Sequence, residues 1–554
     1  MLYFQRTGGD AMQKNEIFRL KAENLGADME GVCRKDGMPV FVPGLLPGEE
    51  TDVRIVKVEK RFAFGRMETP PAEPSPERKD PGCPAYPRCG GCSCRHMRYE
   101  ATLEAKRRQV QDCLERIGGI RIDVPPVLGM DHPNAYRNKT ALPCAGTADA
   151  PVLGFFAPRS HTVIPADACP NAMAPGGEIA GRFLDWMRQH HVEPYCEETH
   201  RGLIRHLVIR VNREGQSMVT VAANGKSLPQ ADDLAGRLKP LNVVSLFLNE
   251  NTARTNVILS GRYHLIYGRE TLPDVLCGLK FELSPGAFFQ VNPAQTEILY
   301  ETALRFAALS PADTLCDVYC GAGTITLMMA RHCKSAVGIE IVPAAVENAR
   351  ANAARNGIPN TEFHAGKAEE LLPRMVKDGL RSSVIVVDPP RKGLEPEVIR
   401  AIAEAAPDRV VYVSCNPATL ARDAGRFADA GYEMQKIQPV DMFCWTSGIE
   451  TVCLLSKLKS TYYIDVDLDL SELDVTQAEA KATYDEIKAY VFEHTGLQVS
   501  NLYIAQVKAK HGIIERNCYN KPKTEGNKVP KCPPDKEKAI ENALRHFQMI
   551  KKEA

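Results

Sequence analysis

One cysteine stands at the end of an apolar strand, where a nucleophile could work. Residues 410–423 read VVYVSCNPATLARD, so Cys415 closes a run of β-branched and aromatic side chains and Asn-Pro follows directly. A thiolate is a strong, soft nucleophile once its pKa is lowered. Taken alone, Cys415 is better explained as a small buried apolar residue. Its function therefore has to be judged together with the other reactive residues of the same region.

A pair of glycines between a strand and a helix predicts a cofactor site. Residues 317–327 read DVYCGAGTITL and contain Gly321 and Gly323. Glycines here let a ligand approach the backbone, and the helix N-terminus supplies free N–H groups. Glu340 ends the next strand, about 20 positions on, where an acidic residue can bind both ribose hydroxyls of a nucleoside. The third glycine of a dinucleotide fingerprint is missing, which favours S-adenosylmethionine over NAD.

Two carboxylates are expected at the same edge of the sheet as Cys415. Residues 386–391 read VVDPPR and end a strand with Asp388, at the carboxyl edge where open α/β sheets bind ligands. The alternative role for Asp388 is a helix N-cap or a turn, but the two prolines that follow make a plain cap a poorer explanation. Glu450 precedes a later strand that can return to this edge.

These residues together suit the methylation of a pyrimidine carbon. C5 of uracil is not nucleophilic enough to take a methyl group unaided. Addition of a thiolate to C6 makes C5 an enolate-like carbon that can attack a sulfonium methyl group. The C5 proton must then leave so that the thiol can be eliminated, and this requires a general base. We expect Cys415 to be the nucleophile and Glu450 the base.

Three closely spaced cysteines predict a metal site. Cys83, Cys89 and Cys92 lie in the stretch CPAYPRCGGC, a Gly/Pro loop that can bend around one centre. The fourth ligand is either the nearby Cys94 or the distant Cys169, which is followed by proline. Thiolates suit zinc and iron–sulfur clusters alike, and the spacing does not choose between them. The alternative is a set of buried cysteines without a metal.

Length and composition set the wider limits. The 554 residues exceed one domain, and the 69 basic and 69 acidic residues neither require nor exclude a nucleic acid partner. No apolar run approaches the ~18 residues that span a bilayer. The N-terminal residues lack the pattern of a secretory signal, so we expect a cytoplasmic protein whose 18 cysteines serve metal binding or catalysis rather than disulfides.

The apolar pattern divides the chain into four regions. They are an all-β barrel over 14–70, an α+β region over 83–285, an α/β region over 286–458 and an appendage of unassigned role over 460–554. The third region alternates strand and helix, which predicts a doubly wound parallel sheet. In the second region we expect helices near 99–117 and 178–190 and several strands, among them RTNVILSG at 254–261. In the barrel, Phe62 and Phe64 among basic residues would suit single-stranded RNA, although an ordinary solvated strand explains them equally well.

Several of these stretches resemble the RNA (uracil-5-)-methyltransferases, chiefly the branch that acts on 23S ribosomal RNA. The resemblance covers residues 14–458 and is carried by FFQVNPAQ, DVYCGAGTITL, VVDPPRKG, YVSCNPATLARD and DMFCWTSGIETV. It implies an N-terminal TRAM barrel, a central RNA-binding domain with an iron–sulfur cluster, and a Rossmann-like S-adenosylmethionine-dependent methyltransferase domain. The implied partner is 23S ribosomal RNA, bound by a monomeric enzyme.

The resemblance also implies roles for single residues. It makes Cys415 the nucleophile and Glu450 the base, and it breaks the tie over the metal in favour of [4Fe–4S]. Arg137, in YRNKTALP, matches a strand that faces RNA, although a plain surface arginine explains it nearly as well. The S-adenosylmethionine contacts are Gln290, Tyr319, Glu340, Asp388 and Thr324, beside Gly321 and Gly323, and the cluster ligands are Cys83, Cys89, Cys92 and Cys169.

The sequence departs from the family pattern at several places. Lys367 stands where some members have a polar amide near the adenine, Cys94 is an additional thiol, and residues 460–554 lie outside the pattern. A tRNA-directed branch shares the catalytic motifs and is the nearest alternative. An adenine or protein N-methyltransferase would need no nucleophilic thiol, and a catalytically silent RNA chaperone would not need Gln290, Glu340 and Cys415 together.

Overall fold

The computed structural model describes residues 12–457, 482–511, 513, 532–547 and 549–550 of the chain. Its contacts divide the chain into two compact units, residues 1–459 and 460–554. The acidic stretch at 462–474, which opens the predicted appendage, lies outside the described residues. Within the parts of the chain that are described, no helix has both the length and the apolar character needed to cross a membrane.

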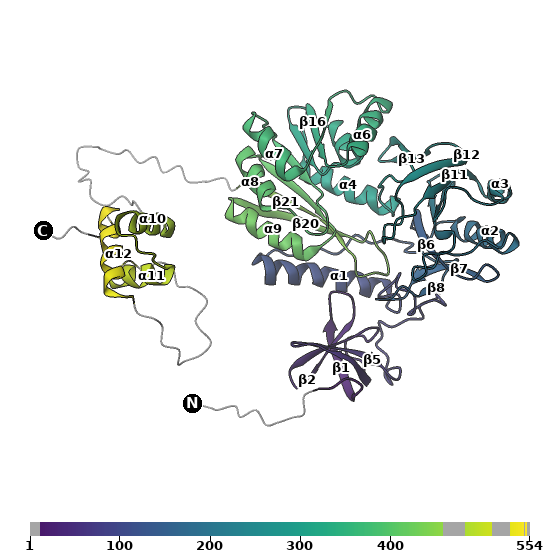
Figure 1. Ribbon diagram of the computed structural model, residues 1–554, viewed down its shortest axis with the longest axis horizontal. Helices are drawn as coiled ribbons and strands as arrows, with labels where there is room; N and C mark the ends of the chain where they lie inside the picture. Colours follow the sequence, from purple (N-terminus) through teal and green to yellow (C-terminus); the bar gives the residue numbers. More distant parts are fainter. Residues whose placement is uncertain (1–11, 458–481, 512, 514–531, 548, 551–554) are drawn as a thin grey trace. The chain divides into compact units, whose positions relative to one another are not determined.

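The chain begins with a small closed β-barrel, as predicted (Figure 1). Alternate residues such as Val40, Val42 and Val53 point inward and form its core. Gly65 faces Val53 so closely that a Cβ at this position would lie 2.3 Å from a valine methyl group. The strands, in the order β1-β2-β3-β5-β4, are β1 (Ile17–Leu25), β2 (Gly31–Lys35), β3 (Met38–Val42), β4 (Glu50–Val58) and β5 (Ala63–Met67).

A seven-stranded sheet follows, in the order β12-β11-β10-β9-β6-β7-β8. Helices α2 (Gly176–Gln189) and α3 (Ala231–Leu238) pack on it through a core around Trp186 and Phe183. The strands are β6 (Lys139–Gly146), β7 (Pro151–Phe156), β8 (Val163–Pro165), β9 (Ile204–Val211), β10 (Ser217–Ala223), β11 (Val243–Glu250) and β12 (Arg262–Gly268). The 3-10 turn Lys239–Leu241 follows α3.

The strand predicted at 254–261 is wrong, because this segment is irregular and β12 begins after it. Its carbonyl groups are bound by side chains instead of a neighbouring strand. Asn251 Nδ2 donates to the carbonyls of Val257 (2.7 Å) and Ile258 (3.0 Å). The Arg205 guanidinium donates to the carbonyl of Thr255 (2.8 Å) and to that of Ala253 (2.6 Å), just before the segment. The apolar pattern did not reveal this competition for the backbone.

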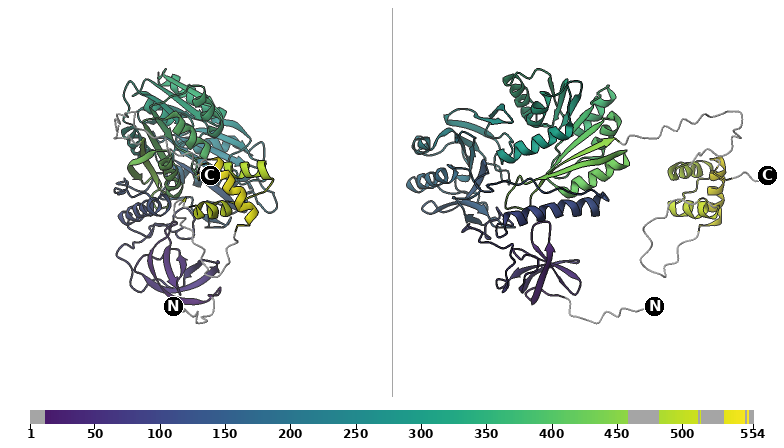
Figure 2. Two further views of the ribbon diagram at one scale, coloured as in Figure 1. Left: turned by 90° about the vertical axis from the view of Figure 1, so that its left-hand side faces the viewer. Right: turned by 180° about the vertical axis from the view of Figure 1, so that it is seen from behind.

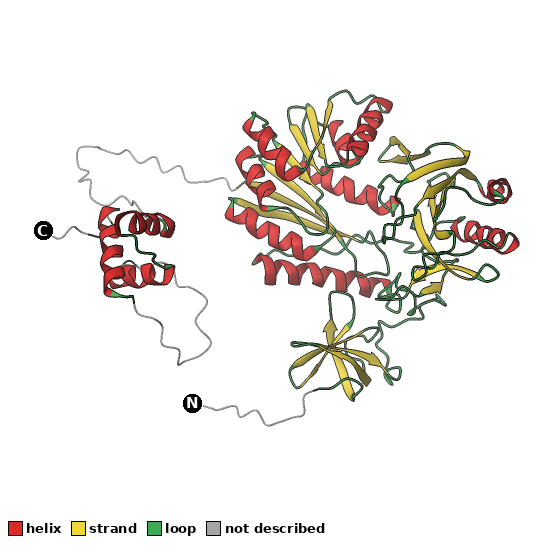
Figure 3. Cartoon of the chain, viewed as in Figure 1, coloured by secondary structure: helices red, strands yellow, loops and turns green. Residues whose placement is uncertain are grey.

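A second seven-stranded sheet, in the order β17-β16-β15-β18-β19-β21-β20, forms the predicted α/β fold. Strands β15 to β19 run parallel, and β21 joins β19 antiparallel. Both faces are covered by helices (Figure 3), so β18 is buried along its whole length. The strands are β15 (Thr314–Val318), β16 (Ser335–Glu340), β17 (Thr361–Ala365), β18 (Val384–Val387), β19 (Arg409–Ser414), β20 (Tyr432–Val440) and β21 (Glu450–Lys457).

The helices of this fold lie in two layers, one on each face of the sheet. The first layer shares its core with the hairpin β13 (Leu272–Leu276) and β14 (Leu279–Leu283) and consists of α4 (Pro293–Ala307), α5 (Thr324–Ala330) and α6 (Pro343–Arg355). The second consists of α7 (Ala368–Lys377), α8 (Pro396–Ala405) and α9 (Pro417–Asp429). Helix α1 (Tyr99–Cys113), continued by the π-helical turn Leu114–Gly118, packs beside α9 in the second layer (Figure 2). The predicted boundary at residue 285 therefore places α1 with one region, although its buried Val110 belongs to the core of the other.

The described residues of the second unit form three helices with a core of their own. Thr483 caps the first with a capping box, and Ser500 caps the second. Ile487, Val491 and Ile540 belong to the fully buried core between the helices. The helices are α10 (Tyr484–Thr495), α11 (Asn501–Lys510) and α12 (Pro534–His546).

Candidate active site

The predicted catalytic residues meet where β19 ends and β21 begins. In the antiparallel ladder between these strands, Ser414 pairs with Thr451. Cys415 follows Ser414 and Glu450 precedes Thr451, so the same register sets the thiol and the carboxyl group side by side. Asp388 follows the neighbouring parallel strand β18 and reaches the same edge of the sheet.

The ionisable groups at this edge perturb one another's pKa values. Cys415 is half-buried, and its pKa is raised to about 11, first by burial and then by the negative charges of Glu450 and Asp388. Glu450 is only 4% exposed, and burial together with the charge of Asp388 raises its pKa well above the usual value. Arg391 opposes both shifts with its positive charge. Such a crowd of perturbed groups at one sheet edge is typical of an active site.

The residues after Cys415 explain why Asn-Pro follows it. Asn416 caps helix α9 by accepting a hydrogen bond from Ala418 N (3.1 Å), and Pro417 occupies the first helical position, where no N–H is needed. The Asn416 amide also donates to the carbonyl of Arg391 (3.2 Å). The helix that begins behind the thiol is thus tied to the loop that follows Asp388.

Asp423, the last residue of the motif at 410–423, holds the loop that follows Asp388 in place. It is fully buried and accepts hydrogen bonds from Leu394 N (2.8 Å) and from the hydroxyl of Tyr412 (2.9 Å). Gly393 approaches Asp423 so closely that a Cβ would lie 2.4 Å from its carboxylate oxygen, and its φ of +79° favours glycine in any case. The motif therefore positions a loop as well as a nucleophile.

The glycine turn after β15 forms an open cradle. Gly321 (φ +57°) and Gly323 (φ +81°) take left-handed conformations, and a Cβ at Gly321 would meet nothing within 4 Å. Glu340 holds the turn by accepting hydrogen bonds from Gly321 N (3.1 Å) and Val342 N (2.8 Å). Ile341, beside Glu340, is an exposed apolar residue (56%). A carboxylate at a strand end and an apolar side chain beside an open turn fit the ribose and base of a nucleoside.

Asp317, at the end of β15 below this cradle, is a further acidic residue that the sequence motifs did not single out. Its side chain is buried, Thr326 Oγ1 donates to one oxygen (2.5 Å), and the other oxygen has no hydrogen-bond partner among the described residues. Burial raises its pKa to about 7, and Asp388 nearby has a pKa raised to about 7 by burial and by the charge of Asp317. An acidic residue inside an apolar strand just before the glycines was the available signal. The two carboxyl groups would be relieved by a cation such as a sulfonium.

The remaining predicted cofactor residues lie in loops and at the start of α5. Tyr319 takes a left-handed conformation (φ 75°) directly after β15. Gln290 lies in the loop before α4, and its carbonyl accepts a hydrogen bond from Asn138 Nδ2 (3.1 Å). Thr324 Oγ1 is hydrogen-bonded to the buried Tyr300 hydroxyl (3.0 Å). Lys367, where the family pattern is broken, forms an exposed ion pair with Glu370 (2.8 Å).

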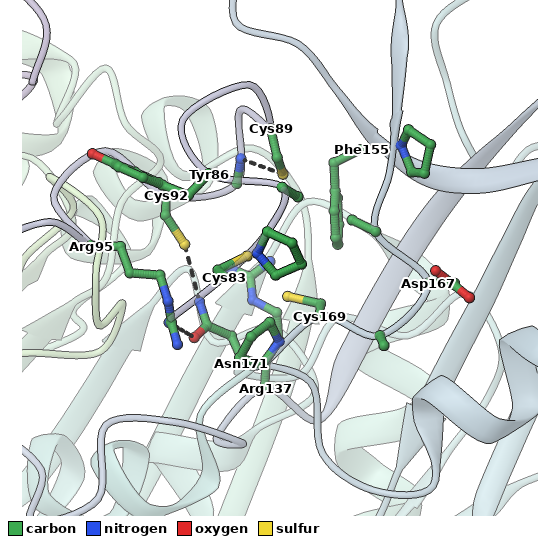
Figure 4. Close-up of a pocket in the computed structure, with 17 residues that line it drawn as sticks. Cys83, Tyr86, Cys89, Cys92, Arg95, Arg137, Phe155, Asp167, Cys169 and Asn171 are labelled. Atoms are coloured by element: carbon green, nitrogen blue, oxygen red, sulfur yellow. Dashed lines mark hydrogen bonds between the residues drawn. The ribbon is translucent and has the colours of Figure 1, made fainter. Parts of the chain in front are cut away.

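The four predicted cluster cysteines line one pocket of about 120 Å³ (Figure 4). Gly91 N donates to Cys89 Sγ (3.3 Å), and Asn171 Nδ2 donates to Cys92 Sγ (3.4 Å). Arg137, predicted to face RNA, lies in the wall of this pocket. Cys94 lies outside the lining and is fully buried. The lining cysteines are Cys83, Cys89, Cys92 and Cys169.

The predicted metal site is not confirmed by the arrangement of these side chains. Among the described residues, no three His, Cys, Asp or Glu side chains are grouped closely enough to hold a metal ion. Burial raises the pKa of Cys92 to about 11, while the charge of Arg95 lowers it. The pocket therefore gathers the four thiols and supplies N–H donors to two of them, but it is not closed around a centre.

Comparison with known proteins gives the family. Residues 264–458 match the family described as tRNA (Uracil-5-)-methyltransferase, and residues 12–67 match the TRAM domain. A protein of Halalkalibacterium halodurans named an uncharacterized RNA methyltransferase is 42% identical over 448 residues, which are 80% of this chain and 98% of the relative. A protein of Clostridium tetani with the same description is 39% identical and covers 82% of this chain and 98% of its own. The chain belongs to this family of S-adenosylmethionine-dependent RNA methyltransferases.

A solved structure shares the fold. The tRNA (uracil-54, C5)-methyltransferase of Pyrococcus abyssi, in complex with S-adenosyl-L-homocysteine, matches with a TM-score of 0.64 at 24% sequence identity. The match covers 79% of this chain and all of that one. At this identity the likeness confirms the methyltransferase fold that the alternating strands and helices predicted.

Proposed function

We propose that the protein methylates C5 of a uridine in RNA through a covalent bond between Cys415 and C6. The observation that carries the proposal is the register of β19 and β21, which sets a half-buried thiol beside a buried carboxyl group. Asp388 and the glycine cradle lie at the same edge of the sheet. A nucleophile, a base and a cofactor site at one edge of the sheet suit a reaction that needs thiol addition and proton removal. N-methylation needs no thiol addition.

The cradle fits S-adenosylmethionine, which supplies a methyl group on a positively charged sulfur. Glu340 would bind the ribose hydroxyls, and Ile341 would lie against the base. Asp317 and Asp388, whose pKa values burial raises to about 7, would face the charged part of the molecule. Gln290, Tyr319 and Thr324 are the further contacts that we propose from the resemblance.

Each protein group then has one task. The Cys415 sulfur adds to C6, and the electron pair moved to C5 makes that carbon attack the methyl group. The Glu450 carboxylate takes the C5 proton, the C5–C6 double bond returns, and the thiolate leaves. The target uridine must be unstacked to reach these groups, as enzymes that act on bases require.

Replacement of the nucleophile tests the reaction. Cys415→Ala should abolish the formation of 5-methyluridine in RNA, measured by nucleoside mass spectrometry. Cys453→Ala is the matched control, because Cys453 is a fully buried thiol on the neighbouring strand β21 and should leave the product intact. Methylation by the Cys415→Ala variant at the normal rate would refute the mechanism.

We propose 23S ribosomal RNA as the substrate, with tRNA as the alternative. Support comes from the resemblance to the ribosomal branch and from the TRAM barrel and cysteine-lined pocket that accompany it. The test incubates the protein with separately transcribed 23S ribosomal RNA and with a tRNA pool and counts transferred methyl groups. Transfer to tRNA alone would select the alternative.

We also propose that Cys83, Cys89, Cys92 and Cys169 bind a [4Fe–4S] cluster. They share one pocket, and the Gly91 and Asn171 N–H groups that point at two sulfurs would stabilise ligating thiolates. Protein purified without oxygen should contain iron and acid-labile sulfide, and Cys169→Ser should lower both. Zinc in place of iron, or no metal at all, would contradict this assignment.

A further inference from the structure

The loop that leads into Glu450 is held by hydrogen bonds from distant parts of the chain. Residues 441–449, here called the base loop, connect β20 to the first residue of β21. Four consecutive carbonyl groups of this loop accept hydrogen bonds from other segments. Met442 O accepts from Asn292 Nδ2 (3.1 Å), Phe443 O from Lys106 Nζ (3.1 Å), Cys444 O from the Tyr136 hydroxyl (3.1 Å), and Trp445 O from the N–H groups of Ser93 (3.0 Å) and Cys94 (3.2 Å).

A buried ion pair anchors the first residue of the base loop. Lys106 Nζ, on helix α1, lies 2.5 Å from Asp441 Oδ1, and both side chains are fully buried. The hydroxyl of Tyr99 donates to the other carboxylate oxygen of Asp441 (2.7 Å) and accepts a hydrogen bond from Met130 N (3.0 Å). Because burying two charges is costly, such a pair contributes little to stability compared with apolar residues of similar size. Its clearer effect is to fix the position of the chain that carries it.

We propose that Lys106 and Asp441 are positioning residues for Glu450. The inference rests on the proposed function, because it assigns them to one step of that reaction. Helix α1 is packed against the methyltransferase sheet through Val110 and Leu114, so it offers a rigid support on which the base loop is fixed. Held in this way, the Glu450 carboxyl group stays at the edge of the sheet beside Cys415.

The step that depends on this position is the last one. When this step begins, the Sγ atom of Cys415 is bonded to C6, and C5 carries both the methyl group and a proton. The Glu450 carboxylate accepts the proton, the C–H electron pair forms the C5–C6 double bond, and the S–C6 pair returns to sulfur as the thiolate leaves. Methyl transfer itself does not use Glu450, so a displaced base leaves the methylated adduct intact and slows its breakdown.

The test follows the adduct and the turnover of the full-length protein with a transcript of 23S ribosomal RNA and S-adenosylmethionine. The variant is the double substitution Lys106→Met and Asp441→Leu, which removes both charges and leaves none unpaired in the interior. We expect kcat to fall about 10- to 100-fold, as small displacements of a catalytic group do. The fraction of enzyme covalently bound to RNA on denaturing gels should rise, while KM for S-adenosylmethionine changes less than about twofold.

Two further variants separate positioning from folding. Tyr99→Phe leaves the ion pair in place and removes one hydrogen bond to Asp441. It should also raise the adduct fraction, but by less than the double variant does. Arg409→Met breaks the ion pair with Asp313 (2.7 Å), which lies at the N-terminal ends of β15 and β19. The candidate active site lies at the opposite, C-terminal ends of these two strands. It should leave the adduct fraction as in the unchanged protein, even where it lowers the melting temperature.

Three results would overturn the inference. An unchanged kcat and adduct fraction in both network variants, or a fall in kcat without more adduct, would show that the network supports the fold but not the base. A rise in adduct with Arg409→Met equal to that of the double variant would do the same. Glu450→Gln is run beside them, and if it traps no adduct the proposed reaction itself fails, which is a distinct outcome from a failure of the network alone.

Discussion

At the scale of single residues, the site contains carboxyl and thiol groups whose uncharged forms are favoured by burial. Cys415 has a pKa of about 11, and Glu450 has a pKa well above its usual value, each through burial first and neighbouring negative charge second. In the proposed reaction both groups act in their ionised forms, Cys415 as a thiolate and Glu450 as a carboxylate. The positively charged sulfur of the methyl donor would lower both pKa values, so that the free protein is the less reactive state.

The pH dependence of the reaction follows from these shifts. Below its pKa the Cys415 thiol is protonated, and each unit of pH raises the thiolate fraction about tenfold. Glu450 acts only after methyl transfer in the proposed reaction, so its ionisation does not enter kcat/KM. We therefore expect kcat/KM to increase steadily between pH 6.5 and 9, measured with labelled methyl donor at constant ionic strength. A kcat/KM that falls over this range would contradict the assignment of Cys415 as the nucleophile.

We expect Asp388 to lower the stability of the folded protein at neutral pH and to contribute to the binding of S-adenosylmethionine. Its folded pKa of about 7 lies above the value of 3.8 for an unperturbed carboxyl group, so the folded protein holds this proton more tightly than the unfolded chain. The stabilisation is present below pH 3.8 and is lost as the pH rises through 7. Asp388→Asn should therefore melt at a higher temperature than the unchanged protein, by a margin that grows from pH 5 to pH 8, and should lose binding of S-adenosylmethionine in calorimetry. A margin that shrinks with pH would refute this sign.

At the scale of elements, the loop after β18 contains Gly393, which is in close contact with helix α9. Gly393→Ala adds a Cβ 2.4 Å from Asp423, whereas Gly379→Ala has a similar left-handed backbone (φ +105°) and open space. The control should lose about 1 kcal/mol from backbone strain. Gly393→Ala should lose about 2–4 kcal/mol, because the loop must also move. Urea unfolding of both variants measures the difference, and equal losses would mean that the contact with Asp423 is unimportant.

The sequence predicted those elements whose signals are local. The strand end just before Cys415 and the glycine turn after β15 could each be recognised from a short stretch. The apolar pattern of segment 254–261 wrongly predicted a strand, whereas side chains of Arg205 and Asn251 bind its carbonyl groups and hold it irregular. The pairing of Lys106 with Asp441 joins residues 335 positions apart, and no local pattern announces it.

At the scale of the whole molecule, the chain combines two units with separate cores. The apolar residues of α10, α11 and α12 pack on one another in a cluster of their own. The active-site residues, the barrel and the cysteine pocket all belong to the first unit. The second unit is the part for which neither the sequence nor the family gives a role.

Separate cores predict separate unfolding. Calorimetry of the full chain should show two transitions, and removal of residues 460–554 should abolish one of them and leave the other within a few degrees. The shortened protein should still methylate RNA. A single shared transition, or aggregation of the shortened protein, would show that the second unit stabilises the first.

The most direct measurement of the central claim uses RNA that contains 5-fluorouridine. Fluorine at C5 cannot be removed as the proton is, so addition of Cys415 to C6 followed by methyl transfer should leave a permanent bond between protein and RNA. We predict a complex that survives denaturation, requires S-adenosylmethionine, carries the nucleotide on Cys415 by peptide mass spectrometry and is formed by Cys453→Ala but not by Cys415→Ala. Methylation of ordinary RNA without any such complex, or a complex formed by Cys415→Ala, would contradict the account.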